Sequence, residues 1–190
     1  MVDMTASTTG STTVTTTGTT TGTTTGTTTG TTPASLARDA IALRPLPSDT
    51  GSRALAAGHG AAGEPVVVRT DLHRVPLRCC LRDSRVGERV ALVAVVPPGP
   101  RGAYRETGPV FVHADDCGGP GHRAYPEDWR RRTQVFRAYD AEGRIVGGSV
   151  VPAGDGQERA AAELLADPAV AFLHTRNVVH GCYLAMIERA

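Results

Sequence analysis

The sequence predicts an α+β protein with a single globular domain over residues 34–190. We expect a mainly antiparallel or mixed sheet of about seven strands, flanked by two or three helices. Short runs of β-branched residues, bounded by Gly and Pro, recur along this region. The few helical patterns do not alternate regularly with these runs, which favours α+β over α/β. Residues 1–33 differ in composition and are expected to form a disordered tail.

The tail consists almost entirely of Thr, Gly and Ser, and residues 15–30 are four copies of Thr-Thr-Thr-Gly. A period of four resembles a helical repeat, but Thr and Gly are poor helix formers and no apolar stripe accompanies them. A segment with so little to bury cannot offset the entropy cost of becoming ordered. We therefore expect a flexible, low-complexity segment.

Removing the tail tests this domain boundary. A protein that begins at Ala34 should unfold at the same temperature as the full chain, because a disordered tail contributes no buried apolar surface. Differential scanning calorimetry of the two proteins provides the measurement. A lower melting temperature for the shorter protein would mean that the tail packs on the domain.

The first half of the domain is expected to contain one short helix and several strands. The helix lies over residues 48–58, where Ser48 or Asp49 can cap its start and Gly58 can end it. The run 89–96 is apolar almost throughout, so we expect a central strand that is buried on both faces. The other strands predicted here lie at 65–69, 78–82 and 109–113.

The second half contains the clearest local signal, a β-hairpin. Its arms, 134–140 and 144–151, are joined by a short loop in which Gly143 suits a positive φ. A helix then begins near Asp155, and Glu158 completes a capping-box pattern. The remaining segments are a loop over 114–125, one or two helical turns over 126–132, and closing strands over 169–176 and 181–187.

Charge and composition exclude several classes of function. The net charge is +1, from 20 basic and 19 acidic residues, so we expect no nucleic-acid partner. The basic turn 129–132 fits a solvated face. No apolar stretch approaches the roughly 20 residues of a membrane helix, and the first residues lack the pattern of a secretory signal. We therefore expect no membrane partner and a cytoplasmic protein with four reduced cysteines.

A series of short motifs occurs in a fixed order along the domain. They are Pro76-Leu77-Arg78-Cys79-Cys80-Leu81-Arg82-Asp83, Gly87-Glu88, Gly108-Pro109-Val110-Phe111-Val112-His113, Arg137-Ala138-Tyr139-Asp140, Ala166-Asp167-Pro168-Ala169-Val170, Asn177 and Gly181-Cys182-Tyr183. With this order and spacing, the chain resembles the bacterial domain-of-unknown-function family 1203 over roughly residues 43–190. The resemblance implies a shared fold and no known reaction, so it transfers no catalytic residue and no cofactor. The chain departs from the expected pattern at Leu77, where we expect many members to have cysteine.

Two groups of His and Cys residues suggest a metal site as one interpretation. If the strand ends that carry them are adjacent, four to six N and S ligands could converge on a transition metal. The spacing matches no zinc finger or zinc ribbon and contains no CxxC pair, so we expect no metal here. The first group is His113, Cys117 and His122, and the second is His174, His180 and Cys182.

A reactive thiol is a second interpretation, with Cys117 as its best candidate because His113 is near in sequence. The adjacent Asp115 and Asp116 would raise the pKa of this thiol, which opposes such a role. The neighbouring pair Cys79–Cys80 is expected on one strand, with the two thiols facing opposite sides and unable to share one partner without distortion.

An anion pocket is a third interpretation. Arg78, Arg82, Arg137 and Arg176 all lie on predicted strands, and an Arg among apolar neighbours needs an anionic partner. We expect internal salt bridges to satisfy most of this need, and a bound carboxylate or phosphate is the alternative. The carboxylates considered as internal partners are Asp83, Glu88 and Asp140.

These interpretations leave two classes of function. The favoured one is a small ligand-binding or interaction module for an unknown small molecule or protein. The alternative is a small metal- or thiol-dependent enzyme around His113, Cys117, His174 and Cys182, so enzymatic activity stays open and no cofactor is identified. The candidate site residues are His113, Cys117, Arg137, His174, Arg176, Asn177 and Cys182.

Overall fold

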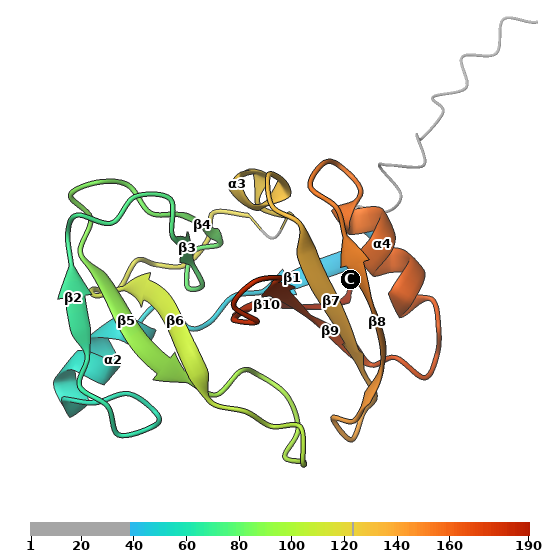
Figure 1. The fold of residues 1–190 in the computed structure, drawn as a ribbon, viewed down its shortest axis with the longest axis horizontal. Helices are drawn as coiled ribbons and strands as arrows, with labels where there is room; N and C mark the ends of the chain where they lie inside the picture. The colour runs from blue at the N-terminus through green and yellow to red at the C-terminus, as the bar shows by residue number, and fades with distance from the viewer. Residues whose placement is uncertain (1–38, 123) are drawn as a thin grey trace, which may run out of the picture. The chain divides into compact units, whose positions relative to one another are not determined.

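The computed structural model describes residues 39–122 and 124–190, all within one compact unit of the chain. The expected tail, 1–33, lies outside the described residues, as does the expected domain boundary. Two five-stranded sheets and three helices make up the described part, which confirms the α+β class (Figure 1). The strands form two sheets instead of the one that the sequence predicts, because local patterns do not indicate which strands pair.

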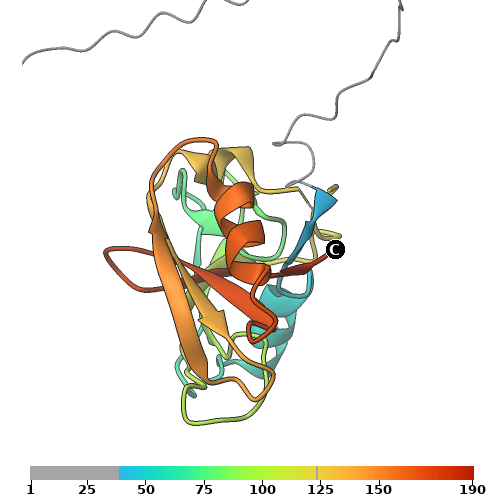
Figure 2. The ribbon, with the colours of Figure 1, turned by 90° about the vertical axis from the view of Figure 1, so that its right-hand side faces the viewer.

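The first sheet has the strand order β1-β10-β9-β7-β8, and all its pairings are antiparallel. The predicted hairpin, in which Gly143 has a φ of 80°, lies at one edge of this sheet, and β9 is the central strand. Helix α4 packs against one face of this sheet (Figure 2), over a core that includes Phe136, Leu173 and Ile187. The strands are β1 (Ile41–Arg44), β7 (Gln134–Tyr139), β8 (Ile145–Val151), β9 (Phe172–Asn177) and β10 (Tyr183–Arg189).

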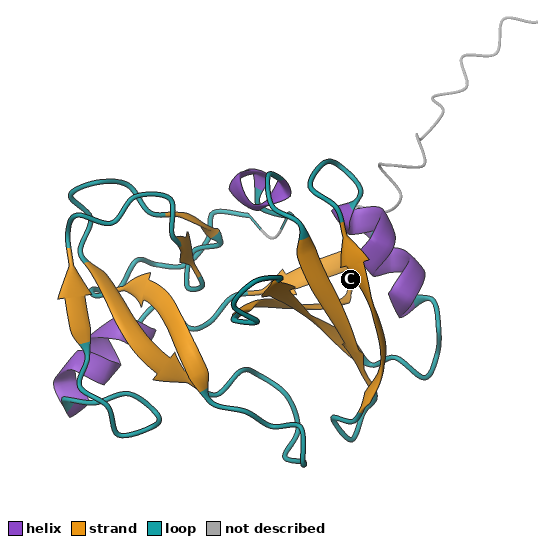
Figure 3. Ribbon diagram, viewed as in Figure 1, coloured by secondary structure: helices purple, strands orange, loops and turns teal. Residues whose placement is uncertain are grey.

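The second sheet has the order β2-β5-β6-β3-β4, with β3 and β6 parallel and the other pairs antiparallel. The apolar run predicted as a central strand is β5, which pairs on both sides. Long loops connect this sheet to the first (Figure 3). The strands are β2 (Val67–Arg69), β3 (Pro76–Leu77), β4 (Arg82–Asp83), β5 (Val90–Val95) and β6 (Gly108–His113).

The three helices are α2 (Thr50–Ala57), α3 (Glu127–Arg130) and α4 (Gln157–Leu165). Helix α2 ends at Gly58 with a φ of 80°, as the sequence predicts. The capping box predicted at the start of α4 is wrong, because the cap position is Gly156 and it makes no side-chain cap. Glu158 instead binds the buried guanidinium of Arg130, whose position in the basic turn was expected to be solvated. No described helix is long and apolar enough to cross a membrane.

The prediction of a strand over residues 78–82 is wrong. Residues 78–81 form a turn between β3 and β4, closed by a hydrogen bond of 3.0 Å from Leu81 N to Leu77 O. Leu81 has a φ of 55°, a left-handed conformation that a continuous strand does not contain. Burial of its apolar side chains stabilises the turn. This burial depends on the tertiary structure, so the local sequence pattern does not indicate it. Strand β1, which the sequence did not predict, pairs with the distant β10.

Candidate functional site

The turn between β3 and β4 presents two adjacent cysteines to the end of β6. Strand β3 pairs with β6 through Leu77 and Phe111, and Arg78 N donates to Phe111 O at 3.0 Å. The turn that follows therefore lies beside the last residue of β6, His113. The backbone N–H of His113 donates to Cys79 Sγ at 3.2 Å.

Four donor atoms gather at this point. The thiols of Cys79, Cys80 and Cys117 and a ring nitrogen of His113 all lie within 4.8 Å of one another. His113 Nδ1 is 3.6 Å from Cys79 Sγ and 3.6 Å from Cys80 Sγ. The expectation that the two adjacent thiols cannot share a partner is wrong, because they stand on a turn and not on opposite faces of a strand.

The far nitrogen of the His113 ring faces a second layer of charged groups. His113 Nε2 is 3.2 Å from Arg82 Nη2 and 3.7 Å from Glu88 Oε2. Arg82 binds both carboxylate oxygens of Glu88, at 3.0 and 2.7 Å. This ion pair lowers the pKa of Glu88 to about 2, chiefly through the hydrogen bond from Arg82. The Nε2 side of the ring thus contacts this ion pair, while Nδ1 faces the thiols.

The thiols differ in their acidity. A hydrogen bond with Cys80, followed by burial, raises the pKa of Cys79 to about 12. The same contact lowers the pKa of Cys80, because Cys79 stabilises the Cys80 thiolate. Burial raises the pKa of Cys117. The direction for Cys117 agrees with the sequence expectation, but its cause is burial and not the neighbouring carboxylates.

Two chemistries suit this group. Three sulfurs and an imidazole nitrogen are ligands that zinc and other soft transition metals prefer. A thiol of lowered pKa beside a histidine also has the composition of a nucleophile. Cys79 and Cys80 were absent from the candidate site residues, and the adjacent pair of cysteines was the available signal. The two thiols of this pair converge only because the chain forms a turn there, and sequence periodicity does not indicate that turn.

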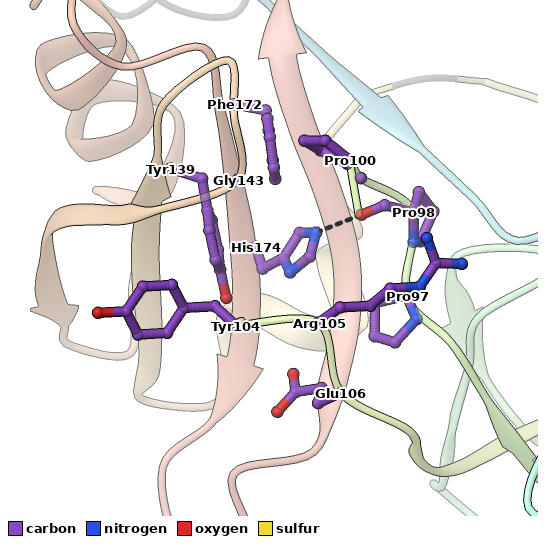
Figure 4. A pocket seen from close by; sticks show the side chains of 11 residues that line it. Pro97, Pro98, Pro100, Tyr104, Arg105, Glu106, Tyr139, Gly143, Phe172 and His174 are labelled. Atoms are coloured by element: carbon purple, nitrogen blue, oxygen red, sulfur yellow. Dashed lines mark hydrogen bonds between the residues drawn. The ribbon is translucent and has the colours of Figure 1, made fainter. Parts of the chain in front are cut away.

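His174 lies elsewhere, on β9, and is not part of the cysteine cluster (Figure 4). Its Nε2 is 2.8 Å from the carbonyl of Pro98, and its Nδ1 is buried with no hydrogen-bond partner. The ring packs against Tyr139 and Phe172, with centroid distances of 4.8 and 5.3 Å. The adjoining cavity measures about 20 Å³, which is room for about one water.

Burial lowers the pKa of His174 to about 4, below its value of 6.5 in an unfolded chain. Between these pH values the unfolded chain binds a proton that the folded protein does not. Stability therefore decreases as pH falls through this window, by an amount that reaches about 3 kcal/mol below pH 4. Chemical denaturation between pH 4 and 7 should show a flatter profile for His174→Gln. Parallel profiles for the two proteins would contradict this assignment.

The other candidate residues have internal roles in the described structure. Arg176 forms an ion pair with Glu106, which is not among the carboxylates expected from the sequence. Arg137 Nη1 donates to the Tyr139 hydroxyl at 3.3 Å. Asn177 Oδ1 accepts two backbone N–H groups of the β9–β10 loop, both at 2.9 Å.

Cys182 does not join the cysteine cluster either. It lies with Asn177 on a separate pocket that also contains Arg78. The two groups of His and Cys residues suggested by the sequence therefore do not converge within the described residues. Only His113 and Cys117 of these groups meet, and their partners come from the β3–β4 turn.

Comparison with known families matches residues 74–189 to the family described as protein of unknown function (DUF1203). The matched region is more than half of the chain and contains the whole cysteine cluster. It confirms the resemblance seen in the sequence motifs. No curated protein and no solved structure gives a significant match.

Proposed function

The chain belongs to this family of proteins of unknown function (DUF1203), and on that premise we propose that it is a zinc-binding module. Cys79, Cys80, His113 and Cys117 are the proposed ligands. A single observation carries the proposal, the gathering of four suitable donor atoms within 4.8 Å of one another. Enzymatic activity is not required for this function.

The distances from the histidine nitrogen to two of the sulfurs fit a tetrahedron around zinc. With Zn–S bonds of about 2.3 Å and Zn–N bonds of about 2.0 Å, a sulfur and a nitrogen ligand stand about 3.5 Å apart. The Nδ1 atom of His113 is 3.6 Å from the sulfurs of both Cys79 and Cys80. Binding of zinc at Nδ1 leaves the ring proton on Nε2, so Arg82 must move away from Nε2, now 3.2 Å distant, and Glu88 Oε2, now 3.7 Å distant, becomes the acceptor.

The surroundings support a structural site. Four protein ligands fill a tetrahedral zinc and leave no position for substrate, which is typical of structural sites. The N–H of His113 that points at Cys79 Sγ would stabilise a bound thiolate. Three thiolates and one Zn²⁺ carry a net charge of −1, and the guanidinium of Arg82 lies close enough to offset it. The ion would tie the β3–β4 turn to the loop after β6.

Elemental analysis of the full-length protein, purified under reducing conditions, tests the proposal. We expect one equivalent of zinc per chain. Replacing zinc with Co²⁺ should produce intense sulfur-to-cobalt charge-transfer absorption, because the cobalt then has thiolate ligands in tetrahedral geometry. A protein that binds no stoichiometric metal under these conditions would exclude this function.

Single variants identify the ligands. Cys80→Ser and Cys117→Ser should each reduce zinc affinity by at least tenfold, because each removes one thiolate ligand. Cys182→Ser is the matched control, since this cysteine lies outside the cluster, and its zinc content should equal that of the wild type. Equal zinc loss in all three variants would mean that the ion is not held by the cluster.

One observation favours a second candidate function, thiol chemistry at Cys80. Its lowered pKa and the nearby His113 ring suit a nucleophile. In that case the protein without metal would react with iodoacetamide at Cys80 much faster than at Cys182. Under the zinc proposal, added zinc suppresses this reaction. Both functions require reduced thiols, which a reducing compartment such as the cytoplasm maintains.

A further inference from the structure

A second pocket, distinct from the cysteine cluster, lies between the second sheet and the β9–β10 loop. Its volume is about 430 Å³, within the range of roughly 300–1,000 Å³ typical of small-molecule sites. Arg74, Arg78, Arg132 and His180 supply its charged and titratable groups, and no Asp or Glu side chain lines it among the described residues. The pocket therefore has a cationic character that the near-neutral chain as a whole lacks.

Arg78 is the unusual member of this group. Its side chain is buried, and the residue is only 3% exposed. Nε donates to Tyr183 O at 2.8 Å and Nη1 to Pro76 O at 2.5 Å, so these bonds aim the guanidinium and satisfy part of it. No carboxylate forms an ion pair with Arg78 within the described structure. A buried charge of this kind is costly unless an anion accompanies it.

Two other arginines, one buried and one half-buried, show what Arg78 lacks. Arg130 is paired with Glu158, and Arg132 binds both oxygens of Asp83 at 2.9 and 2.5 Å. The positive charge of Arg132 is therefore already matched inside the protein. The charge of Arg78 faces a pocket instead of a carboxylate.

The rest of the wall is apolar. Leu92 and Phe111 face each other across the pair β5–β6, and both line the pocket together with Pro109. A ligand that fills this space would bury apolar surface against these side chains, which contributes about 25 cal/mol per Å². The pocket thus has a positive charge at one end and apolar walls at the other, which suits a ligand with an anionic group and an apolar body.

We propose that this pocket binds a small organic anion, with its carboxylate or phosphate group at Arg78 and its apolar body against Leu92 and Phe111. This function goes beyond metal binding and uses different side chains. The exposed Arg74 lies at the same pocket and adds to the positive potential that attracts the anion, and the exposed His180 lies beside it. Asn177 and Cys182, both candidate residues from the sequence, belong to this site.

Isothermal titration calorimetry with the full-length protein tests the site, using benzoate, phenyl phosphate and the neutral benzamide as probes. Benzoate or phenyl phosphate should bind saturably with one site per chain, and benzamide at least tenfold more weakly. Whichever of the two anions binds more tightly identifies the preferred head group. Absence of saturable binding by both, or equal affinity for benzamide, would overturn the proposal.

Two variants and two controls locate the binding. Arg78→Gln should weaken binding of the preferred anion at least tenfold, because it removes the charge at the head-group position. If Arg78→Gln does not fold, His180→Glu provides the test, since it places a carboxylate at an exposed position on the pocket. Arg159→Gln and His122→Glu make the same substitutions at exposed positions that do not line this pocket, and should leave affinity unchanged.

The outcome is separate from that of the zinc proposal. Zinc content is measured on the same sample, so a zinc-loaded protein that binds no anion would refute only the organic-anion site. Anion binding that persists in His180→Glu at wild-type affinity would show that the anion binds elsewhere, and would equally refute it.

Discussion

Removing zinc with a chelator should lower the free energy of unfolding of this protein by about 4 kcal/mol. This value applies to a comparison with protein at a free zinc concentration of about a thousand times its dissociation constant. The physical reason is that the proposed zinc site consists of Cys79, Cys80, His113 and Cys117, which the unfolded chain does not hold together. Urea denaturation with and without chelator, under reducing conditions, measures the difference.

The matched controls are two cysteine variants. In Cys117→Ser the chelator should have a much smaller effect, because zinc binding is already impaired. In Cys182→Ser the effect should equal that in the wild type, since this thiol is not in the cluster. If the chelator leaves the wild-type unfolding curve unchanged, then no metal stabilises the fold and the structural role is refuted.

The substitution Gly51→Ala should destabilise the protein by about 3 kcal/mol or more. This is the reverse of the usual result in a helix, where Ala is about 1 kcal/mol more favourable than Gly. Gly51 lies in the first turn of α2, and a Cβ added there would stand 1.9 Å from the backbone O of His113 and 3.1 Å from Cα of Ala114. Both contacts are with backbone, so relief requires α2 or the end of β6 to move.

That movement would also reach the cluster, because His113 is a proposed ligand. We expect Gly51→Ala to reduce zinc affinity together with stability, measured by competition with a chromogenic chelator. Gly108→Ala, on the same strand β6, is the control, since its added Cβ meets no atom within 4 Å. A Gly51→Ala protein as stable as the wild type would mean that α2 does not pack this closely on His113.

Much of the fold follows from local patterns. The hairpin β7–β8 is predicted from its two arms and the short loop with Gly143, and the end of α2 from Gly58. In each case the signal and the structure lie within a few residues, so the pattern contains the physical cause. The predicted capping box failed for the opposite reason. Glu158 suits either a helix cap or an ion pair, and the distant Arg130 decides between them.

The candidate site was only partly predictable. His113 and Cys117 were identified because they are close in sequence and of the right chemical type. Cys79 and Cys80 were not, because an assumed strand separated their thiols, whereas a turn with Leu81 at a φ of 55° brings them together. The conformation of that turn depends on its neighbours in the fold, so no periodicity in the sequence indicates it.

The sequence by itself determined the α+β class, most of the longer strands and the types of residue available for chemistry. These properties depend on side-chain periodicity, on turn-forming residues and on composition, all of which are local. Only the tertiary structure decided which of those residues meet. Cys79 and His113 are separated by 34 residues and touch because β3 pairs with β6, and Arg78 faces a pocket because the distant β10 accepts its hydrogen bond. Contacts of this kind are set by how the elements pack, which no single segment of the chain encodes.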